Sequence, residues 1–203
     1  MNANIQIIAK EGWFGAIVWA IIFLISAYLD LGFITFVMLL GLAFWLYMFR
    51  NPERIADVDS TSFAAPIDGV VKNIDILEDS VCVEIQTRCY DIGVIRAPMD
   101  ILSANLQCKN GLNLYFSNND KKHMLNASFS LSWQERNDTY RIDFFPQLLD
   151  TSRIYATSNL AVGDRCGYMK IGFTKIYLPK IFNIKVSVGD KVYGYESIIG
   201  YNQ

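Results

Sequence analysis

Residues 69–86 read GVVKNIDILEDSVCVEIQ, and this stretch indicates the fold class of the larger part of the chain. It contains two short runs, 69–76 and 80–86, in which apolar and polar side chains alternate. Alternation with a period of two is typical of a strand that buries one face. Further runs rich in Val, Ile, Tyr and Phe occur at 112–117, 139–145 and 181–188. The sequence therefore predicts a mainly β domain, either a β-sandwich or a partly closed barrel.

Turn signals separate these runs, and no long amphipathic helix interrupts them. The signals are Lys109-Asn110-Gly111, the polar segment 117–120, and the Gly-Asp pairs at 163–164 and 189–190. The C-terminal stretch 186–200 resembles the hammerhead-type strand–turn–strand that closes lipoyl and biotinyl carrier domains. Lys191 in its turn lacks the flanking residues of a carrier lysine. A carrier function is therefore not predicted.

Upstream of these runs, residues 13–49 are almost wholly apolar and contain a single charge, Asp30. As one helix this run would measure about 55 Å, well beyond the ~30 Å hydrocarbon core of a bilayer. Asp30 and Gly32 suit a turn near a polar interface, so we expect two helices, 13–29 and 31–49. The first helix is at the short limit for a full crossing. A two-span hairpin and a hairpin confined to one leaflet both remain open.

Basic residues flank the apolar run, with Lys10 before it and Arg50 and Arg54 after it. This distribution predicts a membrane protein with both ends, and hence the β domain, on the cytoplasmic side. A signal peptide is not expected, because no small-residue cleavage site follows the first helix. The expected organisation is a membrane-anchoring helical hairpin over 1–54, a linker over 55–63 and a β domain over 64–203.

Composition agrees with an anchored protein and excludes several other classes. Hydrophobic residues make up 52% of the 203 residues, more than the roughly 45–50% of a soluble domain. A net charge of −2 gives no electrostatic reason to expect a nucleic-acid partner. The only histidine is His123, and the four cysteines have no paired spacing. We therefore expect reduced thiols and no metal site.

Several short segments extend in order along nearly the whole chain. They are IAKEGW at 8–13, FRNPER at 49–54, APIDGVV at 65–71, RAPMDI at 96–101, LNA at 125–127, QERN at 134–137, and Gly172 with IYLP at 176–179. None of the segments is specific alone, but their order resembles that of the short, membrane-associated phosphatidylserine decarboxylases.

This resemblance implies a β-rich membrane enzyme that converts phosphatidylserine to phosphatidylethanolamine. Members of the family cleave themselves at a Gly-Ser bond, and the serine becomes a pyruvoyl group. The pyruvoyl carbonyl forms a Schiff base with the substrate amine and withdraws electrons as carbon dioxide leaves. An aspartate and a histidine assist the self-cleavage by activating the serine.

The residues that carry this chemistry in the family are only partly present. Asp68 matches the family aspartate, although an Asp-Gly pair also favours a turn. Leu102 stands at the histidine position. The segment IGFTKIYLP at 171–179 is one residue shorter than its counterpart, so the serine position falls on Phe173 aligned from the left and on Gly172 aligned from the right. None of the three replacements can act as base or nucleophile.

Thr174 and His123 are two residues that could substitute for the missing groups. Thr174 carries a hydroxyl one position late, and cleavage before it would leave a ketobutyryl group. It is the alternative nucleophile. His123 lies where the family tends to have lysine, and we interpret it as a surface loop residue.

The sequence thus favours a phosphatidylserine-decarboxylase-like membrane protein of phospholipid metabolism that does not process itself and is catalytically inactive. We expect no cofactor, with a pyruvoyl group only if self-cleavage occurs. Membrane phospholipid is the expected partner, and a homo-oligomer or a protein partner stays open. Two alternatives remain: an active phosphatidylserine decarboxylase with a non-standard cleavage residue, and a membrane-tethered interaction domain. Whether the chain is an enzyme is therefore left open.

Overall fold

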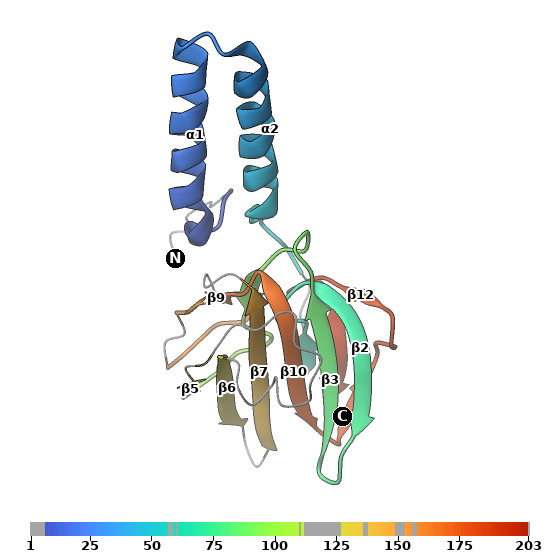
Figure 1. Ribbon diagram of the computed structural model, residues 1–203. Helices are drawn as coiled ribbons and strands as arrows, with labels where there is room; N and C mark the ends of the chain where they lie inside the picture. Colours follow the sequence, from blue (N-terminus) through green and yellow to red (C-terminus); the bar gives the residue numbers. More distant parts are fainter. Residues whose placement is uncertain are drawn as a thin grey trace. The chain divides into compact units, whose positions relative to one another are not determined.

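The computed structural model describes residues 7–56, 59, 61–109, 111, 127–135, 138–148, 153–155 and 158–202. The chain separates into two compact units, Met1–Glu53 and Arg54–Gln203. Figure 1 shows the paired helices of the first unit and the strands of the second.

The first unit is a helical hairpin. A short 3-10 turn, Lys10–Gly12, leads into α1 (Trp13–Tyr28), and α2 (Gly32–Met48) follows. Asp30 lies in the turn with a φ of 56°, a left-handed conformation that Asp adopts more readily than most residues. The expected break is confirmed, and both helices end within one residue of the predicted bounds.

Glycines allow the two helices to approach closely. A Cβ added to Gly15 would overlap the Trp45 indole, and one added to Gly41 would overlap the Trp19 indole. The Trp45 Nε1–H donates a hydrogen bond of 2.9 Å to the carbonyl of Gly12. Small residues beneath large rings are typical of helix pairs that associate in a membrane.

The hairpin presents apolar side chains outward. Phe14 is 80% exposed and Phe33 is 81% exposed. The helical segment Lys10–Tyr28 is long and apolar enough to cross a membrane by length and composition, whereas the apolar helix Gly32–Met48 is shorter. An apolar surface of this extent calls for a non-aqueous environment. The choice between two spans and one leaflet stays a prediction.

The second unit contains thirteen strands among its described residues. They are β1 (Ser62–Ala64), β2 (Gly69–Ile76), β3 (Ser80–Thr87), β4 (Val94–Arg96), β5 (Asn105–Lys109), β6 (Ser128–Glu135), β7 (Asp138–Leu148), β8 (Arg153–Ile154), β9 (Arg165–Tyr168), β10 (Ile171–Pro179), β11 (Phe182–Ile184), β12 (Lys191–Val192) and β13 (Ile198–Asn202). A seven-stranded sheet has the order β12-β2-β3-β10-β7-β6-β5, and two three-stranded sheets have the orders β1-β13-β11 and β4-β9-β8. The mainly β prediction is confirmed, with open, sandwich-like sheets rather than a closed barrel.

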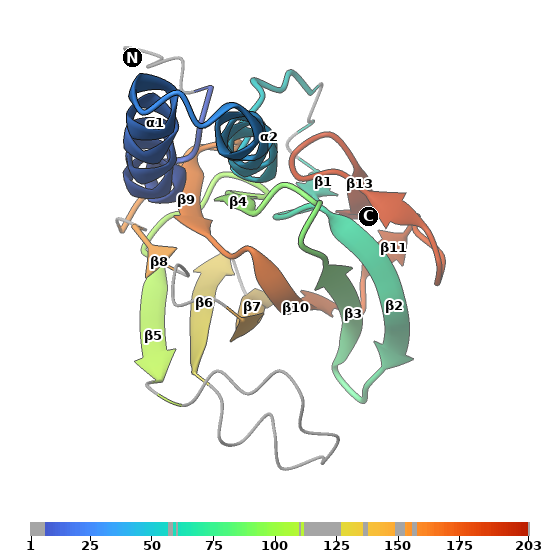
Figure 2. The same ribbon diagram turned by 45° about the horizontal axis from the view of Figure 1, so that its top comes forward.

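One hydrophobic core joins the three sheets, whose strands can be followed in Figure 2. From the large sheet, alternate residues of β10 point into it, among them Ile176 and Leu178. Phe63 of β1 and Ile95 of β4 enter it from the smaller sheets. The core therefore lies between one face of the seven-stranded sheet and the two smaller sheets.

The predicted strands agree with the structure to different degrees. Runs 69–76 and 80–86 correspond to β2 and β3, and 139–145 lies inside β7. Run 181–188 shortens to β11, and run 112–117 lies outside the described residues. β10 was not predicted as a strand, because Phe173 and Tyr177 on its outer face hide the alternation of burial.

The β unit begins earlier than the linker prediction of 55–63 implied. Ser62 and Phe63 form part of β1, which pairs with β13. Phe63 is fully buried and stacks on Trp133 at 6.4 Å between ring centroids. A single aromatic residue in a polar stretch carries no periodicity, so the sequence did not reveal this strand.

Cysteine burial gives a first testable prediction. Cys82 and Cys166 are buried, whereas Cys89 and Cys108 are exposed. Burial raises the pKa of the Cys166 thiol to about 12 from the ordinary value of 9.0. At pH 8, iodoacetamide should therefore modify Cys89 and Cys108 in the folded protein and spare the other two, as peptide mass mapping would show. Modification of Cys166 before unfolding would contradict this placement.

The same thiol should make the protein less stable at alkaline pH. Between pH 9 and about 12 the folded state keeps the Cys166 proton that the unfolded state has lost. Stability is therefore fully present below pH 9 and falls as the pH rises. Urea unfolding of Cys166→Ala should show a weaker loss between pH 8 and pH 10.5 than wild type. Cys89→Ala, at an exposed position, is the matched control and should behave like wild type.

Candidate functional site

Strand register brings two of the candidate positions together. Gly172 of β10 pairs with Thr87 of β3. The Thr87 hydroxyl donates a hydrogen bond of 2.7 Å to the backbone carbonyl of Asp68, the residue just before β2. Asp68 and Gly172, far apart in the sequence, therefore lie on either side of Thr87 at one end of the large sheet.

The Asp68 carboxylate is buried in an ion pair with Arg54. Arg54 donates from Nη1 to Oδ1 at 2.5 Å and from Nη2 to Oδ2 at 2.7 Å. The backbone N–H of Gly194 also donates to Oδ1, at 2.8 Å. Bidentate, charge-assisted pairs of this kind are strong and fix geometry. Both carboxylate oxygens are engaged, so Asp68 has the surroundings of a structural anchor rather than of a free base.

The surroundings of Arg54 keep it charged. Burial alone would lower the pKa of its guanidinium, but the hydrogen bonds and charge of Asp68 raise it above the ordinary value. Glu196 adds a carboxylate oxygen 3.9 Å from Nε, and the Tyr193 ring centroid lies 5.9 Å from Cζ. Arg54 therefore joins the start of the β unit to the turn that contains Tyr193 and Gly194.

This ion pair changes the role predicted for Arg54, which was counted among the basic residues that flank the apolar run and orient it in the membrane. Its side chain is only 6% exposed, so its charge is directed into the β unit and not toward a membrane surface. Arg50, by contrast, lies within the hairpin unit, with Cζ 4.2 Å from the centroid of the Tyr47 ring. The flanking charges that support the predicted orientation are therefore Lys10 and Arg50.

Neither alignment of the serine position can place a serine side chain on the core-facing side of β10 near Thr87. A Cβ at Gly172 would lie 2.4 Å from the carbonyl oxygen of Phe145 and 2.8 Å from Met169 Sδ. Phe173 has a side chain, but alternation directs it to the opposite face of the sheet from the buried Thr87. At residue 172 a side chain has no space, and at residue 173 it points to the opposite face of the sheet.

This geometry predicts that a serine is tolerated less well at position 172 than at position 173. Gly172→Ser should destabilise the protein by about 1–3 kcal/mol or more, because backbone must shift to accept the new atoms. Phe173→Ser, the matched control on the half-buried outer face, should lower stability less and should restore no self-cleavage. Urea midpoints and intact masses of both variants test this. Equal stability of Gly172→Ser and wild type would contradict the packing described.

Thr174 lies in the core, on the central strand. It pairs with Ile85 of β3 and Phe144 of β7. Its residue surface is fully buried, and Oγ1 has no hydrogen-bond partner. Attack on the preceding carbonyl requires a base within reach of the hydroxyl. No described side chain accepts a hydrogen bond from Thr174.

Leu102 lies on the loop after β4 and is 70% exposed. Its neighbours make contacts with the segment 159–162: Ile101 bridges to Leu160, and the Ser103 N–H donates to Asn159 Oδ1 at 3.2 Å. These contacts hold the Leu102 loop against segment 159–162, which is a different part of the β unit from the one that contains Asp68 and Gly172. The described contacts thus bring together two of the family positions and leave the third on the surface.

Sequence reasoning missed two buried charges near this region. The Arg54–Asp68 pair links the segments FRNPER and APIDGVV. The only sign of it in the sequence is that one segment contains a basic residue and the other an acidic one. Lys170 is fully buried two residues before Gly172 and donates from Nζ to the Asp91 carbonyl at 2.9 Å. No pattern in the sequence marks a lysine as buried. His123, segment 125–126 and segment 136–137 lie outside the described residues.

The residues present do not fit a pyruvoyl group. A pyruvoyl group arises from a serine, and the two aligned positions hold Gly172 and Phe173. The nearest hydroxyl along the chain, on Thr174, is enclosed in the core. Among the described residues, no group of three or more His, Cys, Asp or Glu side chains could hold a metal ion.

Comparison with known proteins identifies the relatives of the chain. No family model and no solved structure matches it. It is 27% identical to the phosphatidylserine decarboxylase proenzyme of Desulfotalea psychrophila, over 89% of this chain and 90% of that protein. It is 27% identical to the phosphatidylserine decarboxylase proenzyme of Burkholderia lata, over 98% of each chain.

A third relative is the putative archaetidylserine decarboxylase proenzyme of Methanocaldococcus jannaschii, 23% identical over 78% of this chain and 89% of that protein. The similarity extends over the hairpin as well as the β unit in the Burkholderia comparison, which covers nearly the full length of both proteins. These relatives confirm the resemblance seen in the sequence: the chain is similar to phosphatidylserine decarboxylase proenzymes over most of its length.

Proposed function

We propose that this protein is a membrane-anchored, non-processing member of the phosphatidylserine decarboxylase family that binds phospholipid without decarboxylating it. One observation carries the proposal: the position that a serine side chain would take at residue 172 is already occupied by the Phe145 carbonyl and Met169 Sδ. The homologues support a role in phospholipid metabolism. The proposal adds that this role does not depend on pyruvoyl chemistry.

Two of the three groups that self-cleavage requires are replaced. The nucleophile position is Gly172 or Phe173, without a hydroxyl. The histidine position is the exposed Leu102, which cannot exchange a proton. The aspartate is retained as Asp68, and both of its oxygens bind Arg54. Restoring a serine alone would still leave no histidine to accept its proton.

The intact mass of the purified full-length protein is the direct test, argued in the Discussion. Assays for carbon dioxide release from phosphatidylserine and for flotation with phosphatidylserine vesicles accompany it. An intact chain that releases no carbon dioxide and floats with the vesicles supports the proposal. Cleavage before Thr174 with carbon dioxide release would support an active decarboxylase instead. An intact chain indifferent to the lipid headgroup would support an interaction domain.

The anchoring part of the proposal makes a separate prediction. The full-length protein should remain in the membrane pellet after carbonate extraction, because α1 and α2 expose apolar side chains along their length. Replacing Ile21 and Phe36, which are 50% and 58% exposed, by lysine should move a large part of the protein to the soluble fraction. Ile76→Lys and Leu77→Lys, in the β unit, are the matched controls and should leave extraction unchanged. Release of wild type by carbonate would refute the anchor.

A further inference from the structure

The two ends of the helical hairpin are tied together by backbone hydrogen bonds. The N–H of Ala9 donates to the carbonyl of Phe49 at 2.8 Å, and the N–H of Asn51 donates to the carbonyl of Ile7 at 2.9 Å. From these ends α1 and α2 run side by side to the turn that joins them (Figure 1). Both ends of the hairpin therefore lie at one level, and the turn lies at the other.

The hairpin has the length that a full crossing of a bilayer requires. The segment Lys10–Tyr28 has 19 residues and α2 has 17 residues, which gives about 28 Å and about 25 Å at 1.5 Å per residue. Helices of about 17–25 residues span the ~30 Å hydrocarbon core, and one leaflet offers only roughly half of that depth. A hairpin confined to one leaflet would therefore have to lie strongly tilted.

The surface of the hairpin does not suit a strongly tilted position. A helix that lies along an interface is amphipathic, with a polar side toward water. Every exposed side chain of α1 and α2 is instead apolar or aromatic. The hydroxyls of Ser26 and Thr35 donate to backbone carbonyls about one turn earlier, at 2.8 Å and 3.1 Å. The hairpin between its ends is therefore suited to complete immersion in hydrocarbon.

The turn carries a charge that must reach water. Asp30 is exposed, and no described residue forms an ion pair with its carboxylate or donates a hydrogen bond to it. A carboxylate without a partner is costly in hydrocarbon. Tyr28 beside the turn is 89% exposed, and tyrosine is enriched at membrane–water interfaces. A one-leaflet hairpin would leave Asp30 near the bilayer midplane, whereas a full crossing brings it to the far interface.

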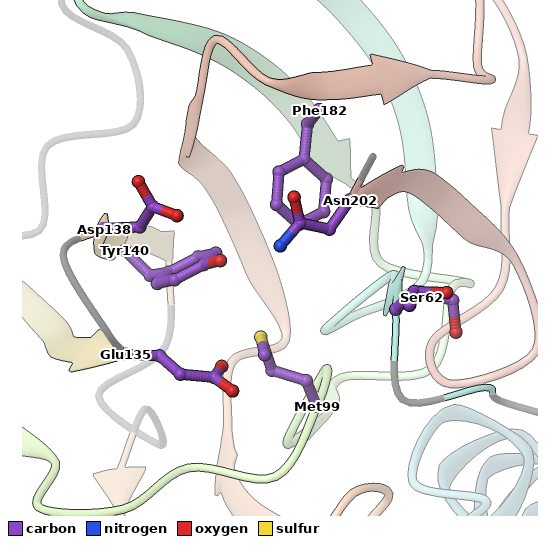
Figure 3. Close-up of a pocket in the computed structure, with 8 residues that line it drawn as sticks. Ser62, Met99, Glu135, Asp138, Tyr140, Phe182 and Asn202 are labelled. Carbon is purple, nitrogen blue, oxygen red and sulfur yellow. The ribbon is translucent and has the colours of Figure 1, made fainter.

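The β unit, by contrast, turns large aromatic rings inward. Tyr140 and Phe182 are 2% and 6% exposed, and their rings meet edge to face with centroids 5.9 Å apart. Together with Met99 they border a pocket of about 150 Å³ (Figure 3). The hairpin therefore carries the continuous apolar surface that a lipid phase would cover.

We propose that the hairpin spans both leaflets and exposes the turn around Asp30 to the aqueous compartment on the far side of the membrane. The chain continues from the second of the tied ends into the β unit, so that unit is on the side of both ends. The partner of the hairpin surface is lipid of both leaflets along α1 and α2. The inference rests on the proposed membrane anchor and goes beyond it, because a hairpin in one leaflet would anchor the protein without exposing any residue on the far side.

Labelling of two thiols in sealed vesicles tests the proposal. The full-length variant with Gly32→Cys and Cys108→Ser keeps the exposed Cys89 of the β unit and adds a thiol in the turn, where a Cβ meets no atom within 4 Å. It is reconstituted in phosphatidylcholine–phosphatidylglycerol vesicles and treated with a membrane-impermeant maleimide, and intact mass counts the labels on each chain. A full crossing gives one label per chain in either insertion orientation, and two labels once a pore-forming toxin admits the reagent.

Ile21→Cys in place of Gly32→Cys is the matched control. Ile21 is 50% exposed midway along α1, so its thiol should stay in hydrocarbon and these chains should carry at most one label even with open pores. The same limit for the Gly32→Cys chains, or two labels per chain in sealed vesicles, would overturn the proposal. Tyr28→Cys repeats the measurement at an exposed position if Gly32→Cys does not fold. Failure of the anchor itself has a different readout, which is release of the protein by carbonate.

Discussion

Purified full-length protein is expected to remain a single chain of 23.1 kDa, with no small fragment on denaturing gels or by intact-mass spectrometry. Self-cleavage in this family requires a hydroxyl that attacks the preceding carbonyl and a base that accepts its proton. Gly172 and Phe173 carry no hydroxyl, and no described group accepts a proton from Thr174. This chain is therefore expected to show no cleavage under conditions in which a self-processing relative is completely cleaved.

The variant Thr174→Val makes this test sharper. The Thr174 hydroxyl is buried without a hydrogen-bond partner among the described residues, so an apolar group of similar shape should stabilise the protein, by roughly 1 kcal/mol. If Thr174 were the nucleophile, the wild type would instead yield a fragment beginning at residue 174, and the substitution would abolish it. Thr87→Val is the matched control. Thr87 is equally buried but donates to Asp68, so its replacement should be destabilising.

The resemblance and the alternation of side chains were sufficient to predict the architecture. The two helices of the hairpin and the strands β2 and β3 follow from local patterns: a long apolar run, a charged turn at Asp30, and alternation with a period of two. Such patterns depend on residues that are neighbours in the sequence. β10 and β1 were missed because their burial depends on partners that the chain supplies elsewhere.

The candidate site was predictable by position but not by contact. Alignment with the family identified Asp68, Leu102, Gly172 and Phe173, but it could not show that Arg54 occupies the carboxylate of Asp68. It could not show the backbone opposite Gly172 either. Both facts depend on strand register, which sets which residues become neighbours across the sheet. The sequence revealed which groups had been replaced, and the structure revealed how the remaining space is used.

Removal of the Arg54 side chain is expected to be among the most destabilising single changes in the β unit. The side chains of Arg54 and Asp68 are 6% and 5% exposed, so Arg54→Ala leaves a carboxylate buried with only the Gly194 N–H as a donor. Breaking a buried pair from one side costs about 3–5 kcal/mol, because the remaining charge is neither paired nor hydrated. Urea unfolding of the full-length protein in detergent would measure the loss.

Lys175→Met is the matched control for this change. Lys175 lies 3.4 Å from Glu84, but both side chains are 25–30% exposed, so its loss should cost no more than about 1 kcal/mol. The double variant Arg54→Met with Asp68→Asn removes both charges and keeps an acceptor for Gly194. It should therefore be more stable than the sum of the two single losses predicts. Similar losses for Arg54→Ala and Lys175→Met would contradict a structural role for the pair.

The ion pair also bears on why the aspartate persists in a chain without the serine and histidine. If Asp68 were a residual catalytic group, Asp68→Asn would leave folding intact, because amide and carboxylate have nearly the same shape. In the geometry described, that substitution leaves Arg54 buried opposite a neutral partner and should be destabilising by an amount comparable with Arg54→Ala. Loss of stability in Asp68→Asn, without any change in intact mass, would assign the retained aspartate to the fold. Unchanged stability would return Asp68 to the candidate catalytic residues.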